Sequence, residues 1–407
     1  MERVERIAGA VVVCLAGVLV AVLAAGGDEP RRAARLAPAA SAQAPVPGPG
    51  AAQATTTAAS TTGTTTPEPA PTSTAADPPP AVPLRQLVGE RLFVRMNGTS
   101  PSRAFRARVR RGEVGGVVLF GPNISTRAQV RRLVARLDAA ARAGGMPAPL
   151  VAIDQEGGLV KRLQTAPPRR SAPQIGATNS TRVARREGLA TGRSLRALGI
   201  DVDYAPVVDV PASSSSFIAP RAFGRDPRRV ARMGGAFADG LQRGGVAGTL
   251  KHFPGLGSAP ANTDFASAIV SAPRSRLRRE LIPYRATGAR LVMLATAVYP
   301  AYDRGVPAAF SRRVVTGLLR EDLDYKGVVV TDDLETPAVR AYTSPAEGAV
   351  RAIEAGADMA LVVGSEAGGA TAFEHMLAAA KSDRLTRERL EASHARVESL
   401  RRSAPRP

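Results

Sequence analysis

The sequence predicts an α/β fold in which eight parallel strands close into a (β/α)8 barrel. Short runs rich in Val, Leu and Ala recur after residue 83, and stretches with helical spacing lie between them. Strands that are apolar throughout are typical of a parallel sheet covered by helices on both faces. Eight such runs in about 320 residues favour the barrel. A doubly wound open sheet is the alternative, but no G-x-G-x-x-G follows the first strand, which weakens dinucleotide binding.

The elements follow in order from this pattern. Helical spacing is clearest over residues 126–143 and 228–244. The eight apolar runs that predict strands span residues 91–96, 115–120, 149–154, 199–210, 247–252, 290–296, 326–333 and 358–364.

Polar side chains stand at the ends of several expected strands. They are Asp154, Asp209, Lys251 with His252, Thr296, and Asp332 with Asp333. In a (β/α)8 barrel the carboxyl ends of the strands form the face that carries the active site. An Asp after a strand can also be the N-cap of the next helix. Because four different strands share the feature, we interpret these residues as one site.

The chain before the barrel has a different composition. Residues 7–27 are uncharged and long enough for one membrane span, with basic residues on both sides. We favour an uncleaved anchor there, and a cleaved signal peptide is the alternative for residues 1–27. Residues 28–82, rich in Ala, Pro, Thr and Ser, predict a disordered linker. The barrel domain is expected over 83–400, with a basic tail at 401–407. The folded part is therefore expected outside the cytoplasm, membrane-anchored or secreted.

Composition excludes several function classes. The only cysteine is Cys14, which lies in the apolar segment, so the barrel has neither a disulfide nor a thiolate metal site. With three His in the chain, a multi-His metal site is not expected, and we predict no metal and no cofactor. The net charge of +20 comes almost wholly from Arg. No basic run is interleaved with aromatic residues, so nucleic-acid binding is not expected. Nothing argues against a monomer.

The residues at the expected strand ends suit a polar sugar. Asp332 could act as a nucleophile or an electrostatic stabiliser, and Asp154 could accept hydrogen bonds from hydroxyl groups. Donors come from Arg162, Arg221, Lys251 and His252. Carboxylates among many donors, without a P-loop or a G-x-S-x-G motif, favour glycosidic chemistry.

Four segments resemble glycoside hydrolase family 3, in the order in which that family has them. "AIDQEGGLVKRL" (152–163) resembles its D-Q-E-G-G-x-V-x-R signature, and "PRAFGRDP" (220–227) its R-x-F-G-x-D-P segment. "KHFPGLG" (251–257) resembles its K-H-F-P-G-H-G loop, and "GVVVTDDLE" (327–335) its nucleophile strand. Because no second domain is expected after the barrel, the chain resembles the single-domain bacterial β-N-acetylglucosaminidase branch of this family.

This resemblance implies a retaining β-N-acetylhexosaminidase that acts on N-acetylglucosamine-containing glycans, such as those of peptidoglycan turnover. Asp332 would be the nucleophile that forms a glycosyl-enzyme. The sugar hydroxyls would be bound by Asp154, Arg162, Arg221, Lys251 and His252.

The loop after residue 251 departs from the family pattern. In that branch a D-S-H triplet supplies the acid/base His; here Asn262, Thr263 and Asp264 stand in its place, and Leu256 replaces the His of P-G-H-G. We expect Asp264 to act as the general acid, with its pKa raised by Phe265 and by the charge of Asp332. We also expect Asn262 to hydrogen-bond Asp264. His375 and His394 are too distant in sequence to replace the missing His.

Two alternatives to hydrolysis follow from this departure. If Asp264 stays ionised, the chain is a weakened or inactive homologue that acts as a cell-surface glycan-binding module. If phosphate replaces water at the glycosyl-enzyme, the chain is a phosphorylase. Leu159 and residues 216–219 also depart from the family pattern, so the substrate itself could differ.

Overall fold

The structure, a computed structural model, describes residues 81–285 and 288–403. Eight parallel strands close into a barrel in which each barrel strand pairs with the next one along the chain, and the last pairs with the first. This confirms the predicted (β/α)8 barrel. The barrel strands are β1 (Leu92–Arg95), β2 (Gly116–Leu119), β3 (Leu150–Ile153), β6 (Val202–Asp203), β7 (Ala247–Phe253), β8 (Leu291–Leu294), β9 (Val328–Asp333) and β10 (Met359–Val362).

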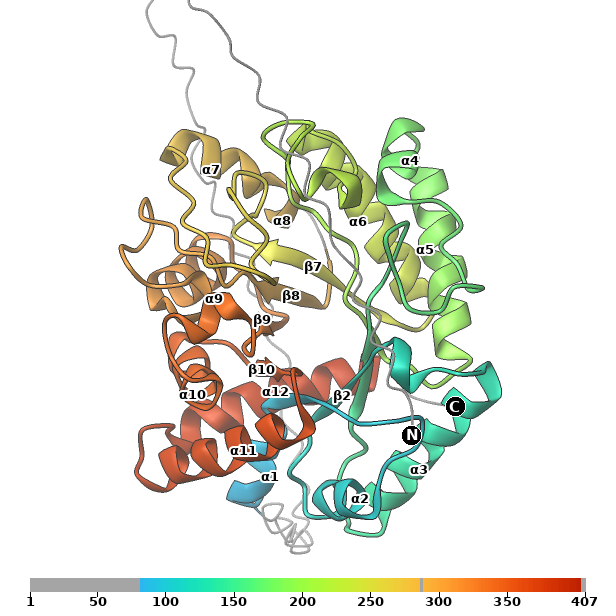
Figure 1. The fold of residues 1–407 in the computed structure, drawn as a ribbon, viewed down its shortest axis with the longest axis vertical. Helices are drawn as coiled ribbons and strands as arrows, with labels where there is room; N and C mark the ends of the chain where they lie inside the picture. The colour runs from blue at the N-terminus through green and yellow to red at the C-terminus, as the bar shows by residue number, and fades with distance from the viewer. Residues whose placement is uncertain (1–80, 286–287, 404–407) are drawn as a thin grey trace, which may run out of the picture. The chain divides into compact units, whose positions relative to one another are not determined.

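Helices surround the barrel and connect its strands (Figure 1). Thr126 and Asp226 begin two of them as N-caps, because their side chains accept the backbone N–H groups of Gln129 and Arg229. The α-helices are α1 (Leu84–Gly89), α2 (Arg103–Arg110), α3 (Arg127–Arg142), α4 (Ala172–Ala177), α5 (Thr181–Arg196), α6 (Pro227–Arg243), α7 (Arg274–Glu280), α8 (Ile282–Arg285), α9 (Pro337–Arg340), α10 (Pro345–Ala355), α11 (Glu366–Lys381) and α12 (Arg387–Ser403).

Shorter elements complete the connections. A small antiparallel hairpin of β4 (Gln155–Gly157) and β5 (Val160–Lys161) follows β3. A π-helix, η4 (Arg313–Asp322), lies between β8 and β9. The 3-10 turns are η1 (Gly121–Asn123), η2 (Ala219–Arg221) and η3 (Ala308–Phe310).

The strand predicted over 199–210 is too long. In the structure β6 ends at Asp203, since Pro206 has no N–H to continue the ladder. Beyond it the chain runs beside the end of β7, where the N–H of Val208 donates to the carbonyl of Lys251 at 2.8 Å. This path places Asp209 next to the loop that follows Lys251.

The barrel interior is filled by side chains from alternate strand positions. Phe93 of β1 packs edge-on against Tyr204, with ring centroids 5.7 Å apart. Val397 and Leu400 of α12 belong to the same buried cluster, so α12 closes the amino-terminal end of the barrel. The carboxyl-terminal end of the barrel, where the strands finish, is not covered by α12 and can therefore carry a binding pocket.

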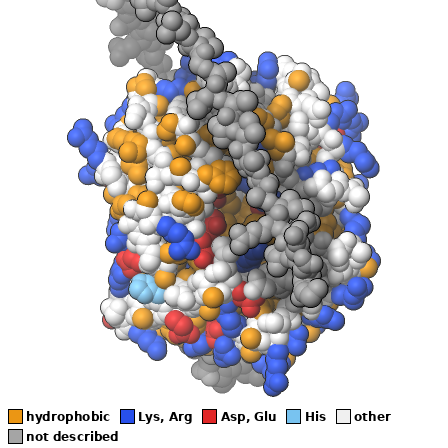
Figure 2. Space-filling view, viewed as in Figure 1, with side chains coloured by type: hydrophobic (Ala, Val, Ile, Leu, Met, Phe, Trp, Pro, Cys, Tyr) orange, Lys and Arg blue, Asp and Glu red, His pale blue; other side chains and the backbone are white. Residues whose placement is uncertain are grey.

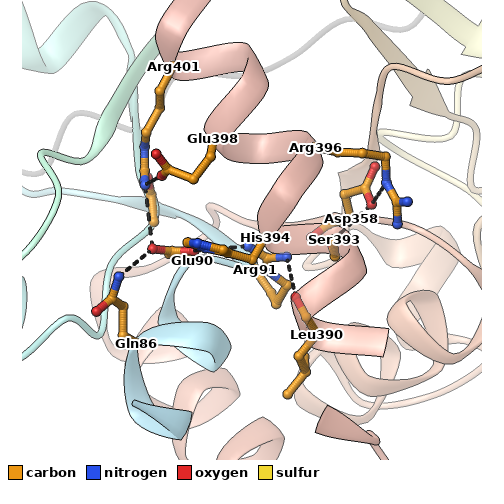
Figure 3. A network of polar contacts seen from close by, with 11 residues as sticks. Gln86, Glu90, Arg91, Asp358, Leu390, Ser393, His394, Arg396, Glu398 and Arg401 are labelled. Carbon is orange, nitrogen blue, oxygen red and sulfur yellow. Dashed lines mark hydrogen bonds and ion pairs between the residues drawn. The ribbon is translucent and has the colours of Figure 1, made fainter. Parts of the chain in front are cut away.

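An ion-pair network fixes α12 to the start of the barrel (Figure 3). Glu90, just before β1, accepts from Arg91, from His394 Nδ1 at 2.6 Å and from Arg401. Burial would raise the pKa of Glu90, but Arg401 and His394 outweigh it and hold that pKa below its usual value. On the same helix, Arg396 donates to Asp358 at 2.7 Å. These contacts hold the closing helix in place.

The predicted anchor, residues 1–27, and the predicted linker up to residue 80 lie outside the described residues. Within 81–285 and 288–403, no helix combines the length and the apolar character needed to cross a bilayer. On the face in Figure 2, Lys and Arg side chains are spread around the rim.

Candidate active site

A pocket of about 390 Å³ opens where the barrel strands end. Figure 2 shows acidic side chains beside a hollow near the centre of this face. The seven residues for which a catalytic or sugar-binding role is predicted all line the pocket: Asp154, Arg162, Arg221, Lys251, His252, Asp264 and Asp332. Of the other strand-end residues, Asp333 lines it too, whereas Asp209 and Thr296 are buried and are not among the lining residues. The pocket therefore collects residues from five different segments of the chain, as the strand-end argument predicts.

Lys251 is the centre of a buried ion-pair network. Its Nζ lies 2.9 Å from Asp154 Oδ1 and 2.7 Å from Glu156 Oε1. Arg221 donates twice to Glu156, at 2.9 and 2.7 Å. Burial opposes ionisation of both carboxyls, but nearby cations prevail and hold both pKa values below their usual values: Lys251 and Arg162 for Asp154, and Lys251 and Arg221 for Glu156. The network presents fixed charges and hydrogen-bonding groups to a polar ligand.

Arg162 completes this side of the pocket. Its Nη2 lies 3.5 Å from Asp154 Oδ2, and its guanidinium lies 5.6 Å from the centre of the Phe120 ring. Arg95, at the end of β1, approaches the same ring at 5.5 Å. Phe120 thus provides an aromatic surface in the pocket wall, flanked by two cations.

His252 is oriented by a buried carboxylate. Its Nδ1 lies 2.7 Å from Asp209 Oδ2, while Asp209 Oδ1 accepts the backbone N–H of Leu256 at 2.7 Å. Burial would raise the pKa of Asp209, but His252 and these hydrogen bonds keep it low. Asp209 therefore fixes both the imidazole and the turn of the loop, and Nε2 remains as the ring nitrogen available to the pocket.

Asp332 lies at the end of β9, among groups of both signs. Burial raises its pKa, the charge of Asp264 adds to the rise, and His252 and Lys251 oppose it. The next residue, Asp333, accepts the backbone N–H groups of Glu335 and Val363, so it supports the turn after the strand. Asp332 accepts the backbone N–H of Asp333 at 2.9 Å, within its own turn, and lines the pocket.

The environment of Asp264 differs from the expected one. Its side chain is exposed, and Phe265, expected to shield it, is itself 78% exposed. The predicted apolar shield is therefore wrong, because the loop turns the phenyl ring to the outside. Asn262 does bond to Asp264, but through the backbone: its Oδ1 accepts the Asp264 N–H at 3.0 Å. Asp264 nevertheless lines the pocket that contains Asp332.

The loop is held from below by Glu280 of α7. Glu280 Oε2 accepts the N–H of Gly257 at 3.1 Å, and Oε1 accepts the Ser258 hydroxyl. Arg276 Nε lies 3.3 Å from the same carboxyl group. Burial raises the pKa of Glu280 to about 7 even with these partners. The segment that carries Asp264 is thus tied to a helix on the outer wall.

Glu156 was not predicted as a site residue, although it stands in the same D-Q-E-G-G segment as Asp154. Asp209 was predicted at this face as a strand-end carboxylate, but not as the residue that orients His252. Tyr204 and Phe120 line the pocket too, and their aromatic character alone predicts only a core position.

The other two histidines lie away from the pocket. His375 contacts Glu347 on the outer helices, and His394 belongs to the network of Figure 3. His394, Glu90 and Glu398 hold potential metal-ligand atoms within 4.8 Å of one another. Arg401 contacts both of these glutamates, so we assign the group to the ion-pair network that holds α12.

Fold and site together define a class: a (β/α)8-barrel glycosidase, whose strand-end pocket sets aspartates among arginine, lysine and histidine donors. The sequence model described as "Glycosyl hydrolase family 3 N terminal domain" matches residues 84–400. The chain belongs to glycosyl hydrolase family 3.

Individual relatives agree with this membership. A beta-hexosaminidase of Nitrosomonas eutropha is 36% identical over 282 residues, which cover 67% of this chain and 80% of that protein. A secreted glycosyl hydrolase of Arthroderma benhamiae is 32% identical over 337 residues, 80% of this chain and 95% of that protein. The solved family 3 beta-N-acetylglucosaminidase of Paenibacillus sp. superposes with a TM-score of 0.77 at 37% identity, over 80% of this chain and 63% of that one.

Proposed function

We propose that this chain is a retaining hydrolase of terminal β-N-acetylglucosaminides, with Asp332 as nucleophile and Asp264 as general acid and base. The observation that carries the proposal is the placement of both aspartates on one pocket with the Lys251 network. The beta-hexosaminidases and beta-N-acetylglucosaminidases among its relatives support the sugar.

The substrate would be oriented by the charged residues of the pocket. Asp154 and Lys251 hold each other at 2.9 Å and offer an acceptor and donors to adjacent sugar hydroxyls. Arg162 and Arg221 add donors, and His252, oriented by Asp209, offers Nε2. Because these groups are already fixed by one another, little side-chain ordering is needed when the sugar binds.

The reaction would proceed in two displacements. In the first, a carboxylate oxygen of Asp332 bonds to the anomeric carbon while the bond to the aglycone oxygen breaks, and Asp264 gives that oxygen its proton. In the second, water attacks the anomeric carbon and the bond to Asp332 breaks. Asp264 takes the proton of the water, which restores both aspartates and releases the sugar with its configuration retained.

The same proposal includes the arrangement of the whole chain. An apolar segment at residues 7–27 would anchor or export the protein, and the linker over 28–82 would hold the barrel away from the membrane surface. The barrel would act as a monomer outside the cytoplasm on glycans of the cell wall. A secreted family member among the relatives supports this location.

Two aryl β-N-acetylglucosaminides, one with a good and one with a poor leaving group, test the roles of the aspartates. The full-length chain should cleave both. Asp264→Ala should lose about 10²–10⁴-fold on the poor leaving group and much less on the good one, because only the former needs protonation. Asp332→Asn should abolish turnover while the chain still binds N-acetylglucosamine.

Other outcomes would assign the chain differently. Sugar binding without turnover of either substrate would make it a glycan-binding module. A rate that depends on phosphate, with a glycosyl phosphate as product, would make it a phosphorylase. If Asp264→Ala affected neither substrate, another group would have to supply the proton.

A further inference from the structure

A groove of about 540 Å³ lies on the outer wall of the barrel, apart from the strand-end pocket. It is formed by α7 and α8 on one side and by the π-helix η4 on the other. Arg274, Arg278, Arg285 and Arg313 line it, together with Tyr302 and Asp322. The sequence is unusual here, since residues 271–290 contain six arginines and one carboxylate, Glu280.

The positive charge of the groove is poorly compensated. Among the described residues, no carboxylate comes within 4 Å of the guanidinium of Arg274, Arg278 or Arg285 in any ion pair. Arg313 has Asp303 at 3.8 Å, and Asp303 also accepts the Ser311 hydroxyl. Four cations thus face a groove whose own lining supplies one carboxylate. Such a concentration of one sign attracts counter-ions of the other.

Tyr302 gives the groove a hydrogen-bonding group as well. Its ring lies under the Arg274 guanidinium, 5.9 Å from ring centre to Cζ. Its hydroxyl is buried and, in the part of the chain that the structure describes, has no hydrogen-bond partner. Burial raises the pKa of Tyr302 to about 12, so the group remains an O–H donor at neutral pH. A buried donor without a partner is costly unless a ligand satisfies it.

The groove begins at the face of the barrel that carries the active-site pocket. Tyr302 lies in the segment that leaves β8, and α7 follows the loop that leaves β7, so both start from the strand-end face. From there α7 and α8 lead back toward the start of β8, and Arg274, Arg278 and Arg285 succeed one another along them. A linear ligand could therefore lie in the groove while the pocket is free to bind sugar.

We propose that this groove is a second binding site, for a linear polymer of phosphodiester-linked polyols or sugars. Guanidinium groups pair two N–H donors with two phosphate oxygens, so a row of arginines suits a row of phosphates. The groove lining has one aromatic residue, Tyr302, which already lies under Arg274. Stacking platforms for successive bases are therefore lacking in this lining, which favours a polyol or sugar phosphate over single-stranded nucleic acid.

Isothermal titration of the full-length chain with poly(glycerol phosphate) tests the site. The triple variant Arg274→Gln, Arg278→Gln, Arg313→Gln should bind at least about 10-fold more weakly, and Tyr302→Phe several-fold more weakly. A matched control removes three exposed arginines from other helices: Arg131→Gln, Arg132→Gln, Arg186→Gln. Its affinity should stay within about twofold, because it loses the same charge without touching the groove.

Hydrolysis of the small aryl substrate reports on folding, and we expect both triple variants to keep it. Equal losses in the two triple variants would overturn the proposal, since net charge alone would then explain binding. The proposal would also be overturned if the wild type did not bind poly(glycerol phosphate). A single-stranded oligonucleotide of matched phosphate number should bind more weakly than the polyol polymer. If it bound as tightly, the assigned ligand class would be wrong.

Discussion

Asp154 and Asp203 come from neighbouring strands and differ sharply in their surroundings. Asp154 has Lys251 at 2.9 Å, whereas Asp203 accepts one backbone N–H, from Gln155, and its Oδ2 has no partner within the described chain. Burial raises the pKa of Asp203 to about 8. The same type of side chain is thus an ion in one position and a neutral acid at physiological pH in the other.

Asp203 should therefore make stability depend on pH. In the unfolded chain its carboxyl ionises near pH 3.9, but in the folded chain only near pH 8. The folded state holds this proton more tightly, so its contribution to stability is complete below about pH 4 and is lost as the pH rises toward 8. Asp203→Asn, which cannot ionise, should have a Tm that exceeds the wild-type value by a margin growing from pH 5 to pH 8.

Thermal melts at these two pH values check the sign of the change. Asp201→Asn, just before the same strand β6, is the control, and its difference in Tm from the wild type should not grow with pH. A margin that stays constant between pH 5 and pH 8 would show that Asp203 is already ionised in the folded chain.

The site residues that sequence reasoning identified were those that follow strands or stand in family motifs. Sequence reasoning could not determine which carboxylates pair with other side chains of the protein and which are free to bind a ligand. Lys251 contacts Asp154 from 97 positions away, and Asp209 contacts His252 from 43. Whether Glu156 or Asp209 meets a ligand or a cation depends on which segment lies opposite, and that is a property of the closed barrel.

At the scale of elements, the loop over 254–266 depends on α7. Gly257 and Ser258 donate to Glu280, whose carboxyl group is fully buried. Close packing leaves no room for adjustment, since a Cβ on Gly257 would lie 1.9 Å from the carbonyl oxygen of Val210. The loop can therefore keep its shape only while this acceptor is present.

Glu280→Ala should release the loop and misplace Asp264. We expect kcat/KM to fall at least about 10-fold on the poor-leaving-group glycoside, and less on the good one, because the proton donor is displaced while Asp332 stays on β9. Glu280→Gln, which retains one acceptor oxygen, should lie between Ala and wild type. Equal losses on both substrates would show that Glu280 supports the whole pocket instead.

Periodicity predicted the elements better than their ends. The helices expected at 126–143 and 228–244 are α3 and α6, and their boundaries differ by a residue because Thr126 and Asp226 are caps. The apolar run 199–210 did not reveal that β6 has two residues, because its later part is equally buried but pairs with β7 only through isolated contacts such as the bridge between Val207 and Lys251.

At the scale of the whole molecule, stability depends on contacts between the first barrel strand and the last helix, α12. Arg91 is fully buried, and its ion-pair partner is Glu90, which also binds His394 and Arg401 of α12 (Figure 3). Glu90→Ala would leave the Arg91 charge buried without a carboxylate.

This substitution should lower the free energy of unfolding by about 3–5 kcal/mol, as measured by urea denaturation at pH 7. Glu398→Ala, which removes a partner of Arg401 at the edge of the same network, is the control and should cost less than about 1 kcal/mol. If the two variants were equally stable, the network would not be what holds α12.

The closing helix also has a consequence for synthesis. Val397 and Leu400 finish the barrel interior, yet they come some three hundred residues after β1 opens it. Until α12 has been synthesised, the interior cluster lacks these two side chains, so the barrel cannot complete its core before translation has passed residue 403.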